Sequence, residues 1–152
     1  MSDHTKTEEV RKRPLENTQL LLDNGAQVDV RDEDGNTPLI LAAKGVRRPE
    51  TIQLLIEKGA KVNARNNDGW TPLMIAARGS GWQSIQLLIK KGAEVNVRNN
   101  DGWTPLMIAA RWCNNSEIIL WLLDNGADAT AENKLGKKAV FYARDNNVAL
   151  ED

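Results

Sequence analysis

Short apolar segments recur along the chain, and their spacing predicts pairs of helices. In residues 73–77 the sequence Leu-Met-Ile-Ala-Ala follows a Thr-Pro dipeptide, and a second apolar stretch at residues 84–91 precedes Gly92. A Thr hydroxyl can cap the start of a helix, and Pro at the next position costs no hydrogen bond there. Gly92 then ends the second helix, because glycine adopts the left-handed conformation without strain. Each unit is therefore expected to hold two short helices, with an extended segment leading into the next turn.

The same unit is repeated at a fixed period. Thr-Pro-Leu stands at residues 37–39, 71–73 and 104–106, with separations of 71 − 37 = 34 and 104 − 71 = 33 residues. Gly-Ala dipeptides recur in step, with separations of 34, 33 and 34 residues; they begin at Gly25, Gly59, Gly92 and Gly126. Two markers that share a period of this size indicate a solenoid of stacked supersecondary units.

These repeated segments resemble the ankyrin repeat family. Residues 68–77, with the sequence Asp-Gly-Trp-Thr-Pro-Leu-Met-Ile-Ala-Ala, and the copy at residues 101–110 follow the family pattern almost throughout. The resemblance extends over about residues 14–145. It implies an all-α fold, a solenoid of stacked helix-turn-helix units with projecting β-hairpin loops.

The repeat markers divide this one domain into full and partial units. Full repeats are expected at residues 34–67, 68–100 and 101–134, after a partial repeat at residues 14–33 that matches only the second helix and the hairpin. Residues 1–13 are polar and are expected either to fray or to form a capping helix. Residues 135–152 are expected to form a capping repeat with one polar-faced helix, because nothing stacks on the end of a solenoid.

One position inside the repeats departs from the family pattern. The usual His after Thr-Pro-Leu is replaced by Ile40, Met74 and Met107. We therefore expect apolar packing between the repeats in place of the hydrogen-bond network that His would supply.

Composition and charge narrow the classes of function. Lys plus Arg total 20 and Asp plus Glu total 21, so the formal net charge is 20 − 21 = −1. A dedicated duplex-DNA binder needs a strong basic excess, which this chain lacks. The N-terminus has no apolar signal sequence and the apolar runs are too short to span a bilayer, so a cytoplasmic protein is expected.

Residues that could carry catalysis or bind a metal are scarce. Cys113 is the one cysteine and His4 the one histidine, which excludes an internal disulfide and leaves little material for a zinc site or for His-based catalysis. Asp34, Asp68 and Asp101 recur at one turn position, which indicates a turn role. Cys113 lies in an inter-helix loop with no base nearby in sequence, and we interpret it as incidental. No enzyme activity and no cofactor are expected.

The candidate binding residues occupy the variable positions of the family pattern. In ankyrin-like units the hairpin tip and the exposed side of the first helix form a concave surface that usually binds a partner. Aligned repeats place Trp before the capping Thr and Arg after the paired alanines. Trp and Arg are enriched at binding hot spots, and Arg over a Trp ring adds a cation–π contact. The predicted partner-binding residues are Asn36, Lys44, Trp70, Arg78, Trp103, Arg111 and Trp112.

Structural roles stay open for some of these side chains. Trp70 and Trp103 also suit packing on each other and on neighbouring hairpin stems. Arg31, Arg65 and Arg98 form a column in the hairpins. This column suits either an acidic partner or, by preference, pairing with Asp and Asn residues of the adjacent hairpin.

Two further tryptophans fall outside the predicted surface. Trp121 is in register with Leu54 and Leu87, so core packing is expected for it. Trp82 begins a second helix, and no role is assigned to it.

Functions of different classes fit these patterns. The first is a non-catalytic protein-protein interaction module, monomeric, that binds a partner protein on its concave face. The alternatives are single-stranded nucleic-acid binding on the same face, which the net charge disfavours, and a structural spacer without a cognate. An enzyme ranks last, because no residue set supplies base, nucleophile and oxyanion donor together.

Overall fold

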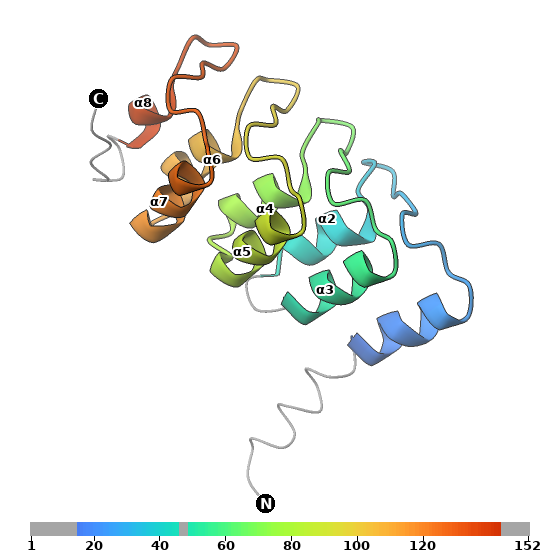
Figure 1. Cartoon of the computed structure of the whole chain (residues 1–152). Coiled ribbons are helices and arrows are strands. Elements are labelled where there is room, and N and C mark those ends of the chain that lie inside the picture. Colours follow the sequence, from blue (N-terminus) through green and yellow to red (C-terminus); the bar gives the residue numbers. More distant parts are fainter. Residues whose placement is uncertain (1–14, 46–48, 144–152) are drawn as a thin grey trace, which may run out of the picture.

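Two rows of short helices form a solenoid, and loops project along one side of it (Figure 1). The computed structural model describes residues 15–45 and 49–143. The first-helix row consists of α2 (Pro38–Ala43), α4 (Pro72–Arg78), α6 (Pro105–Trp112) and α8 (Ala139–Ala143). The second-helix row consists of the helix at residues 15–23, α3 (Pro49–Glu57), α5 (Trp82–Lys90) and α7 (Ser116–Asp124). The all-α solenoid expected from the sequence is confirmed.

Each of the first three helices of the first-helix row begins at a Thr-Pro dipeptide. The Thr37 hydroxyl accepts a hydrogen bond from the backbone N–H of Ile40 at 3.3 Å, and Thr71 and Thr104 do the same in α4 and α6. All three Thr residues have extended backbone angles, and Pro follows as the first helical residue. A cap of this kind satisfies one of the amide groups that a helix start leaves without a partner.

An Asp or Asn side chain organises every projecting loop. The Asn99 Oδ1 atom accepts hydrogen bonds from the backbone N–H groups of Asp101 at 3.0 Å and Trp103 at 2.9 Å. Asp32, Asn66 and Asn133 make the same pair of contacts in the other loops. A backbone hydrogen bond then closes each loop, as from Asn99 N–H to the Trp103 carbonyl at 3.0 Å. The expected β-hairpins are thus hairpin-shaped turns, and no residue in the described ranges is part of a strand.

Neighbouring loops are joined by backbone contacts at the repeat spacing. The N–H of Asn67 donates to the Asp34 carbonyl at 2.9 Å, and the N–H of Asn100 donates to the Asp68 carbonyl at 3.0 Å. Gly69 lies at this junction with φ +81°, and a Cβ atom there would lie 2.9 Å from the Asn100 nitrogen. Glycine is therefore required by both its backbone angle and the close approach of the next loop.

The hairpin arginines bind the adjacent loop, although through acceptors that the sequence did not indicate. The Arg31 guanidinium donates to the Arg65 carbonyl at 2.8 Å, and that of Arg65 donates to the Arg98 carbonyl at 2.7 Å. Arg98 continues the ladder to the Glu132 carbonyl. The preferred expectation of contact with the adjacent hairpin is met, but main-chain carbonyls replace the Asp and Asn side chains that it named.

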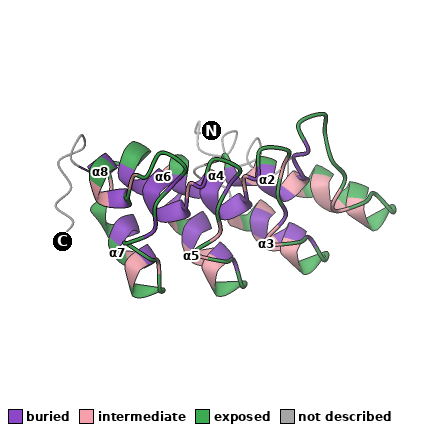
Figure 2. Cartoon of the chain, turned by 90° about the horizontal axis from the view of Figure 1, so that it is seen from above, coloured by how far each residue is buried: buried purple, intermediate pink, exposed green. Residues whose placement is uncertain are grey.

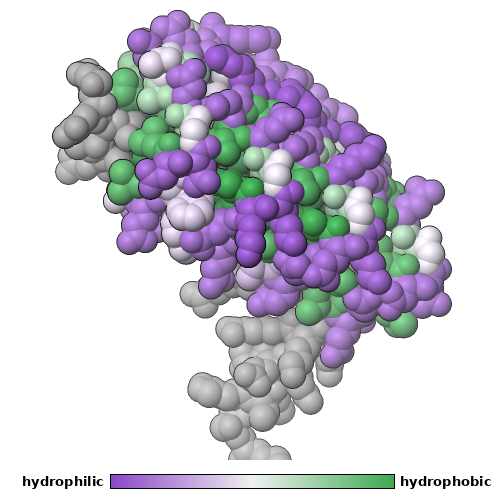
Figure 3. Space-filling view, in the orientation of Figure 1, coloured by the Kyte–Doolittle hydropathy of each residue, from purple (hydrophilic) through white to green (hydrophobic). Residues whose placement is uncertain are grey.

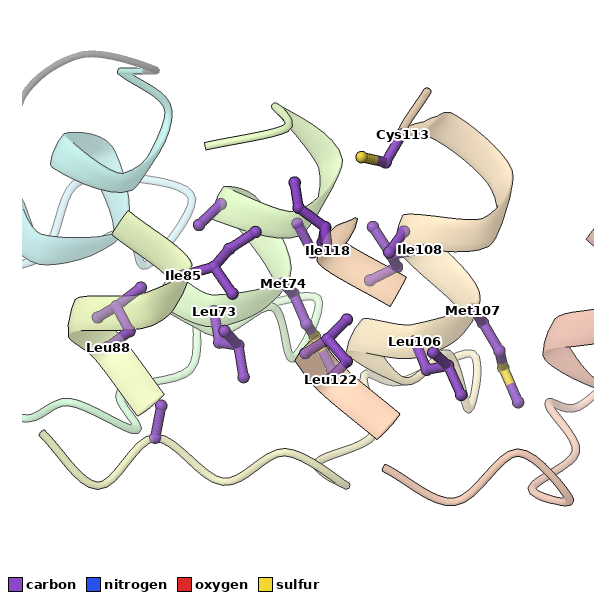
Figure 4. Close-up of a cluster of buried hydrophobic side chains, with 14 of the residues drawn as sticks. Leu73, Met74, Ile85, Leu88, Leu106, Met107, Ile108, Cys113, Ile118 and Leu122 are labelled. Carbon is purple, nitrogen blue, oxygen red and sulfur yellow. The ribbon is translucent and has the colours of Figure 1, made fainter. Parts of the chain in front are cut away.

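The core lies between the two helix rows, where the buried residues face one another (Figure 2). Ile40, Met74 and Met107, which stand where the ankyrin pattern that the sequence resembles has His, are at most 1% exposed. Both methionines belong to the buried apolar core, and Figure 4 shows Met74 within the cluster and Met107 at its edge, pointing away from Leu106. Apolar packing therefore takes the place of a polar network between the repeats, as expected.

Trp121 and Trp82 pack against each other in the second-helix row. Their rings meet edge to face with centroids 5.6 Å apart. Both residues are partly buried against the core. The core role expected for Trp121 agrees with this packing, and Trp82, to which the sequence assigned no role, is its partner.

The N-terminal end of the described chain is the least buried part of the solenoid. No residue from 15 to 34 is fully buried, and Leu20 and Leu21 are each 63% exposed. The polar segment expected at residues 1–13 lies outside the described residues. At the other end, α8 is the last helix of the described chain. It contains no charged residue and its Phe141 is 47% exposed, so the polar face expected for a capping helix is not seen in it. The capping repeat at residues 135–152 therefore stays a prediction. No helix in the described ranges is long and apolar enough to cross a membrane.

Asn99 tests the importance of the loop network for stability. We expect Asn99→Ala to lower the free energy of unfolding by about 1–2 kcal/mol, because two backbone N–H groups lose their acceptor. Asn99→Asp should cost much less, because Asp32 makes the same contacts in the first loop. Urea denaturation followed by circular dichroism measures both values. Equal losses for the two variants would contradict this role of the Oδ1 atom.

Asp32 makes the stability of the first loop depend on pH. The pKa of Asp32 is lowered by hydrogen bonds from the Asn36 backbone N–H, the Asn36 side chain and the Asp34 N–H. The positive charge of Lys44 lowers it further. A carboxyl with a lowered pKa stabilises the fold above its unfolded pKa of about 4, and the stabilisation is lost as the pH falls through the folded pKa. The melting temperature should therefore fall less for Asp32→Asn than for the wild type when the pH is lowered from neutral to strongly acid. Equal losses would show that Asp32 does not contribute.

Candidate partner-binding site

A continuous row of aromatic rings crosses the first-helix row, and an arginine lies within it. We name this row the aromatic strip and define it by Trp70, Arg78, Trp112, Trp103 and Tyr142. The guanidinium carbon of Arg78 is 5.8 Å from the Trp70 ring centroid and 5.5 Å from that of Trp112. The Trp103 centroid is 5.1 Å from that of Trp112 and 4.4 Å from that of Tyr142. The strip therefore links the stem of the second loop to the C-terminal helix α8.

The loop network sets the positions of two rings in the strip. Trp70 and Trp103 precede the capping Thr of α4 and α6, and each donates its backbone N–H to the Asn that organises its loop, at 2.9 Å. Both residues are half-buried and pack against the core. Their direction is thus fixed by the backbone of the loop on one side and by the start of the helix on the other.

Arg78 ends α4 and lies between rings from two repeats. Trp70 belongs to the same repeat, whereas Trp112 is the last residue of α6. Each cation–π contact of an exposed arginine is worth about 0.5–1 kcal/mol. The contacts restrict a long side chain that is otherwise exposed, so the positive charge is held at a defined place on the surface.

The C-terminal helix contributes a ring that sequence reasoning missed. Tyr142 is 6% exposed, and its hydroxyl accepts a hydrogen bond from the Asn133 side chain at 2.7 Å. Phe141 meets Tyr142 edge to face at 5.2 Å and is 47% exposed, with the Lys137 ammonium 4.2 Å from its centroid. The signal available in the sequence was the Phe-Tyr pair in the capping helix, at positions where α4 and α6 carry aliphatic residues.

The predicted binding residues separate into the members of the aromatic strip, two cations at helix ends, and one loop residue that is described below. Trp70, Arg78, Trp103 and Trp112 come together in the aromatic strip, and Trp112 is 42% exposed. Lys44 and Arg111 are exposed at the ends of α2 and α6.

Asn36 is placed differently from the other predicted residues. It is 7% exposed, its amide nitrogen donates to Asp32, and its oxygen accepts from the Asn66 amide at 3.0 Å. Its side chain therefore belongs to the loop network, and the structure gives it a structural role in place of the surface position expected for it.

Cys113 is buried and does not line this surface. It is 0% exposed, and its sulfur accepts hydrogen bonds from the Ser80 hydroxyl at 3.2 Å and the Asn115 N–H at 3.4 Å. It lies in the loop after α6, as expected, but as an interior residue that joins this loop to the loop after α4. The described part of the chain contains no group of three His, Cys, Asp or Glu residues that could hold a metal ion.

Two shallow grooves lie at the opposite end of the solenoid. One lies between the helix at residues 15–23 and α3, and its lining includes Leu15, Leu54 and Glu57. The other includes Thr18, Leu41 and Leu55. Neither groove includes a residue of the aromatic strip.

Polar, apolar and charged residues occupy different parts of the surface. Figure 3 shows hydrophilic residues along the projecting loops and hydrophobic residues in a band over the helices. The helices α2, α4, α6 and α8 contain no Asp or Glu, and Lys44, Arg78 and Arg111 stand at or just after the ends of three of them. The aromatic strip is therefore bordered by positive charge along the first-helix row.

Two family models match overlapping parts of the chain. Residues 50–133 match a family model described as ankyrin repeats in three copies. Residues 21–76 match a second model, described as ankyrin repeats in many copies. No curated protein matches the chain.

Removal of the Tyr142 hydroxyl tests the contribution of its hydrogen bond with Asn133 to stability. We expect Tyr142→Phe to lower the free energy of unfolding by about 1 kcal/mol, because the buried Asn133 amide loses its acceptor. The ring contact with Trp103 stays. Denaturation monitored by circular dichroism measures the change, and Phe141→Tyr, which alters an exposed neighbour, is the control. A neutral Tyr142→Phe variant would contradict the structural importance of this hydrogen bond.

Proposed function

The chain belongs to the ankyrin repeat family, and from this premise we propose that it binds a partner protein through the aromatic strip and the cations beside it. Ankyrin repeats are generally protein–protein interaction modules and are typically non-catalytic. The observation that carries the proposal is the 42% exposed side chain of Trp112, next to an arginine already held between two tryptophan rings. We further propose that the protein acts as a cytoplasmic monomer without a cofactor.

The physical argument for this surface rests on preorganisation. Binding costs free energy for every long side chain that must be ordered at the interface, about 0.5–1.5 kcal/mol each. Arg78 and the rings of the strip are already held by one another, so less of this cost remains. Tryptophan and arginine are also the side chains that most often dominate an interface when they are desolvated at its centre.

A second candidate is single-stranded nucleic acid bound on the same face. Bases stack on exposed aromatic rings, and Trp112 beside Arg78 supplies a ring and a cation for such a contact. The net charge of −1 and the acidic residues in the projecting loops oppose this function. Protein binding is therefore the preferred proposal.

Trp112→Ala is the direct test of the proposed function. Wild-type and variant chains would serve as baits in a cell lysate, and the captured proteins would be identified by mass spectrometry. We expect a protein retained by the wild type to bind the variant about 2 kcal/mol more weakly, or about thirtyfold, because an exposed anchor is lost. Isothermal titration calorimetry with the purified partner measures the difference.

Leu120→Ala is the matched control for this test. Leu120 is 58% exposed in α7, in the second-helix row, so its truncation also removes a large exposed apolar side chain. It should leave partner binding unchanged, and thermal melting should show that both variants are folded. A partner that loses affinity with Leu120→Ala and not with Trp112→Ala would contradict the proposed site.

A further inference from the structure

The first-helix row differs in charge from the second-helix row. Acidic residues are absent from α2, α4, α6 and α8, whereas α3 carries Glu50 and Glu57, and α7 carries Glu117 and Asp124. The C-terminal ends of α4 and α6 present Arg78 and Arg111 on the row that holds the aromatic strip. Both arginines are exposed. This row therefore favours a ligand that combines negative charge with apolar or aromatic side chains.

The residue that organises each loop is acidic in the first loop and uncharged in the next two, so the surface charge becomes more positive toward the C-terminus. In the first loop the organising residue is Asp32, and the charge of Lys44 contributes to its lowered pKa, so these two charges partly offset each other. In the next two loops the same contacts are made by Asn66 and Asn99. An amide carries no charge, so this column supplies no carboxylate beside α4 or α6.

The spacing of the helices sets the spacing of the charges. The helices α4 and α6 pack directly on each other, and packed helices lie about 8–10 Å apart. Arg78 and Arg111 occupy equivalent positions, 111 − 78 = 33 residues apart, in these two neighbouring helices. In the polyproline II form of an extended chain, three residues complete one turn, so side chains three residues apart share a face and lie about 9 Å apart, at about 3.1 Å for each residue. Carboxylates three residues apart in a polyproline II segment therefore match the two arginines.

We propose that the partner presents an acidic segment in the extended polyproline II conformation across α4 and α6. Acidic side chains three residues apart meet Arg78 and Arg111, and an apolar or aromatic side chain between them packs on Trp112. This inference rests on the proposed function and specifies the chemistry of the partner. An extended segment lies flat on a row of side chains, whereas a helix, about 10–12 Å wide, needs a groove to bury a comparable share of its surface.

Selection from a displayed library of random short peptides tests this inference without a known partner. The wild-type chain is the bait, and the enriched sequences are compared with those selected by the Arg78→Gln/Arg111→Gln variant. We expect enrichment of peptides with Asp or Glu three residues apart and an aromatic or large aliphatic residue between them. The double variant should not enrich them.

The matched control carries the same change in charge on the other row of helices. Lys90→Gln/Lys91→Gln removes two exposed cations at the end of α5 and should select the same peptides as the wild type. For a synthetic copy of the most enriched peptide, fluorescence anisotropy should give a Kd at least about tenfold higher for the arginine variant. Rising NaCl concentration should weaken wild-type binding, because exposed charges are screened.

The other outcomes separate this inference from the proposed function. Peptides without an acidic pattern that bind through Trp112 would reject the acidic segment and leave the binding face standing. Peptides whose binding is unchanged by both Trp112→Ala and the arginine variant would reject the acidic segment and the proposed binding face. Acidic residues spaced seven apart would indicate a helix and reject the extended segment. Tighter binding of an oligothymidylate than of the peptide would reject the inference in favour of single-stranded nucleic acid, and no enriched peptide would also reject it.

Discussion

The rest of the solenoid depends on one interaction in each loop, in which a single side-chain oxygen accepts hydrogen bonds from two backbone N–H groups. Asp32, Asn66, Asn99 and Asn133 each hold a loop in this way. The rigid loop then presents its backbone to the next loop, sets the capping Thr at the start of α2, α4 and α6, and directs the residue before that Thr. Helices of only five to nine residues are too short to be stable alone. Their stability comes from packing that these loops bring into register.

Much of the fold could be predicted from the sequence, because the period and the caps are local signals. Thr-Pro dipeptides located the starts of α2, α4 and α6, and the Met residues in place of His indicated apolar packing. Contacts between repeats were harder to predict. The burial of Asn36 depends on an amide 30 residues away, and the acceptors of the arginine ladder are carbonyls that carry no sequence signal. Alignment of the repeats predicted most of the strip, but it cannot reveal a ring such as Tyr142 that has no counterpart in the other repeats.

The aromatic strip combines contacts between repeats with the surface that we propose for partner binding. Trp103 joins α8 to α6 through its ring contacts, and Arg78 joins the second repeat to the third. Packing and partner contact are therefore not competing interpretations of the tryptophans, since one face of a ring can pack while the other stays exposed. Trp103 is half-buried, whereas Trp112 is 42% exposed, which is why the proposed partner contact is placed at Trp112 while the predicted role of Trp103 in binding stays a prediction.

Substitution of Asp by Asn in the loop column shows how the surface charge can change while the fold is kept. The Oδ1 atom accepts the same two hydrogen bonds in the first loop, where it belongs to Asp32, and in the later loops, where it belongs to Asn. Loop geometry is therefore insensitive to the charge of this residue, whereas the electrostatic potential beside α4 and α6 is not. Because the same loops also set the positions of Trp70 and Trp103, rings and charge can be varied independently on a constant backbone. A repeat scaffold of this kind can thus acquire a charged binding face in its later repeats without a change in the contacts that stack them.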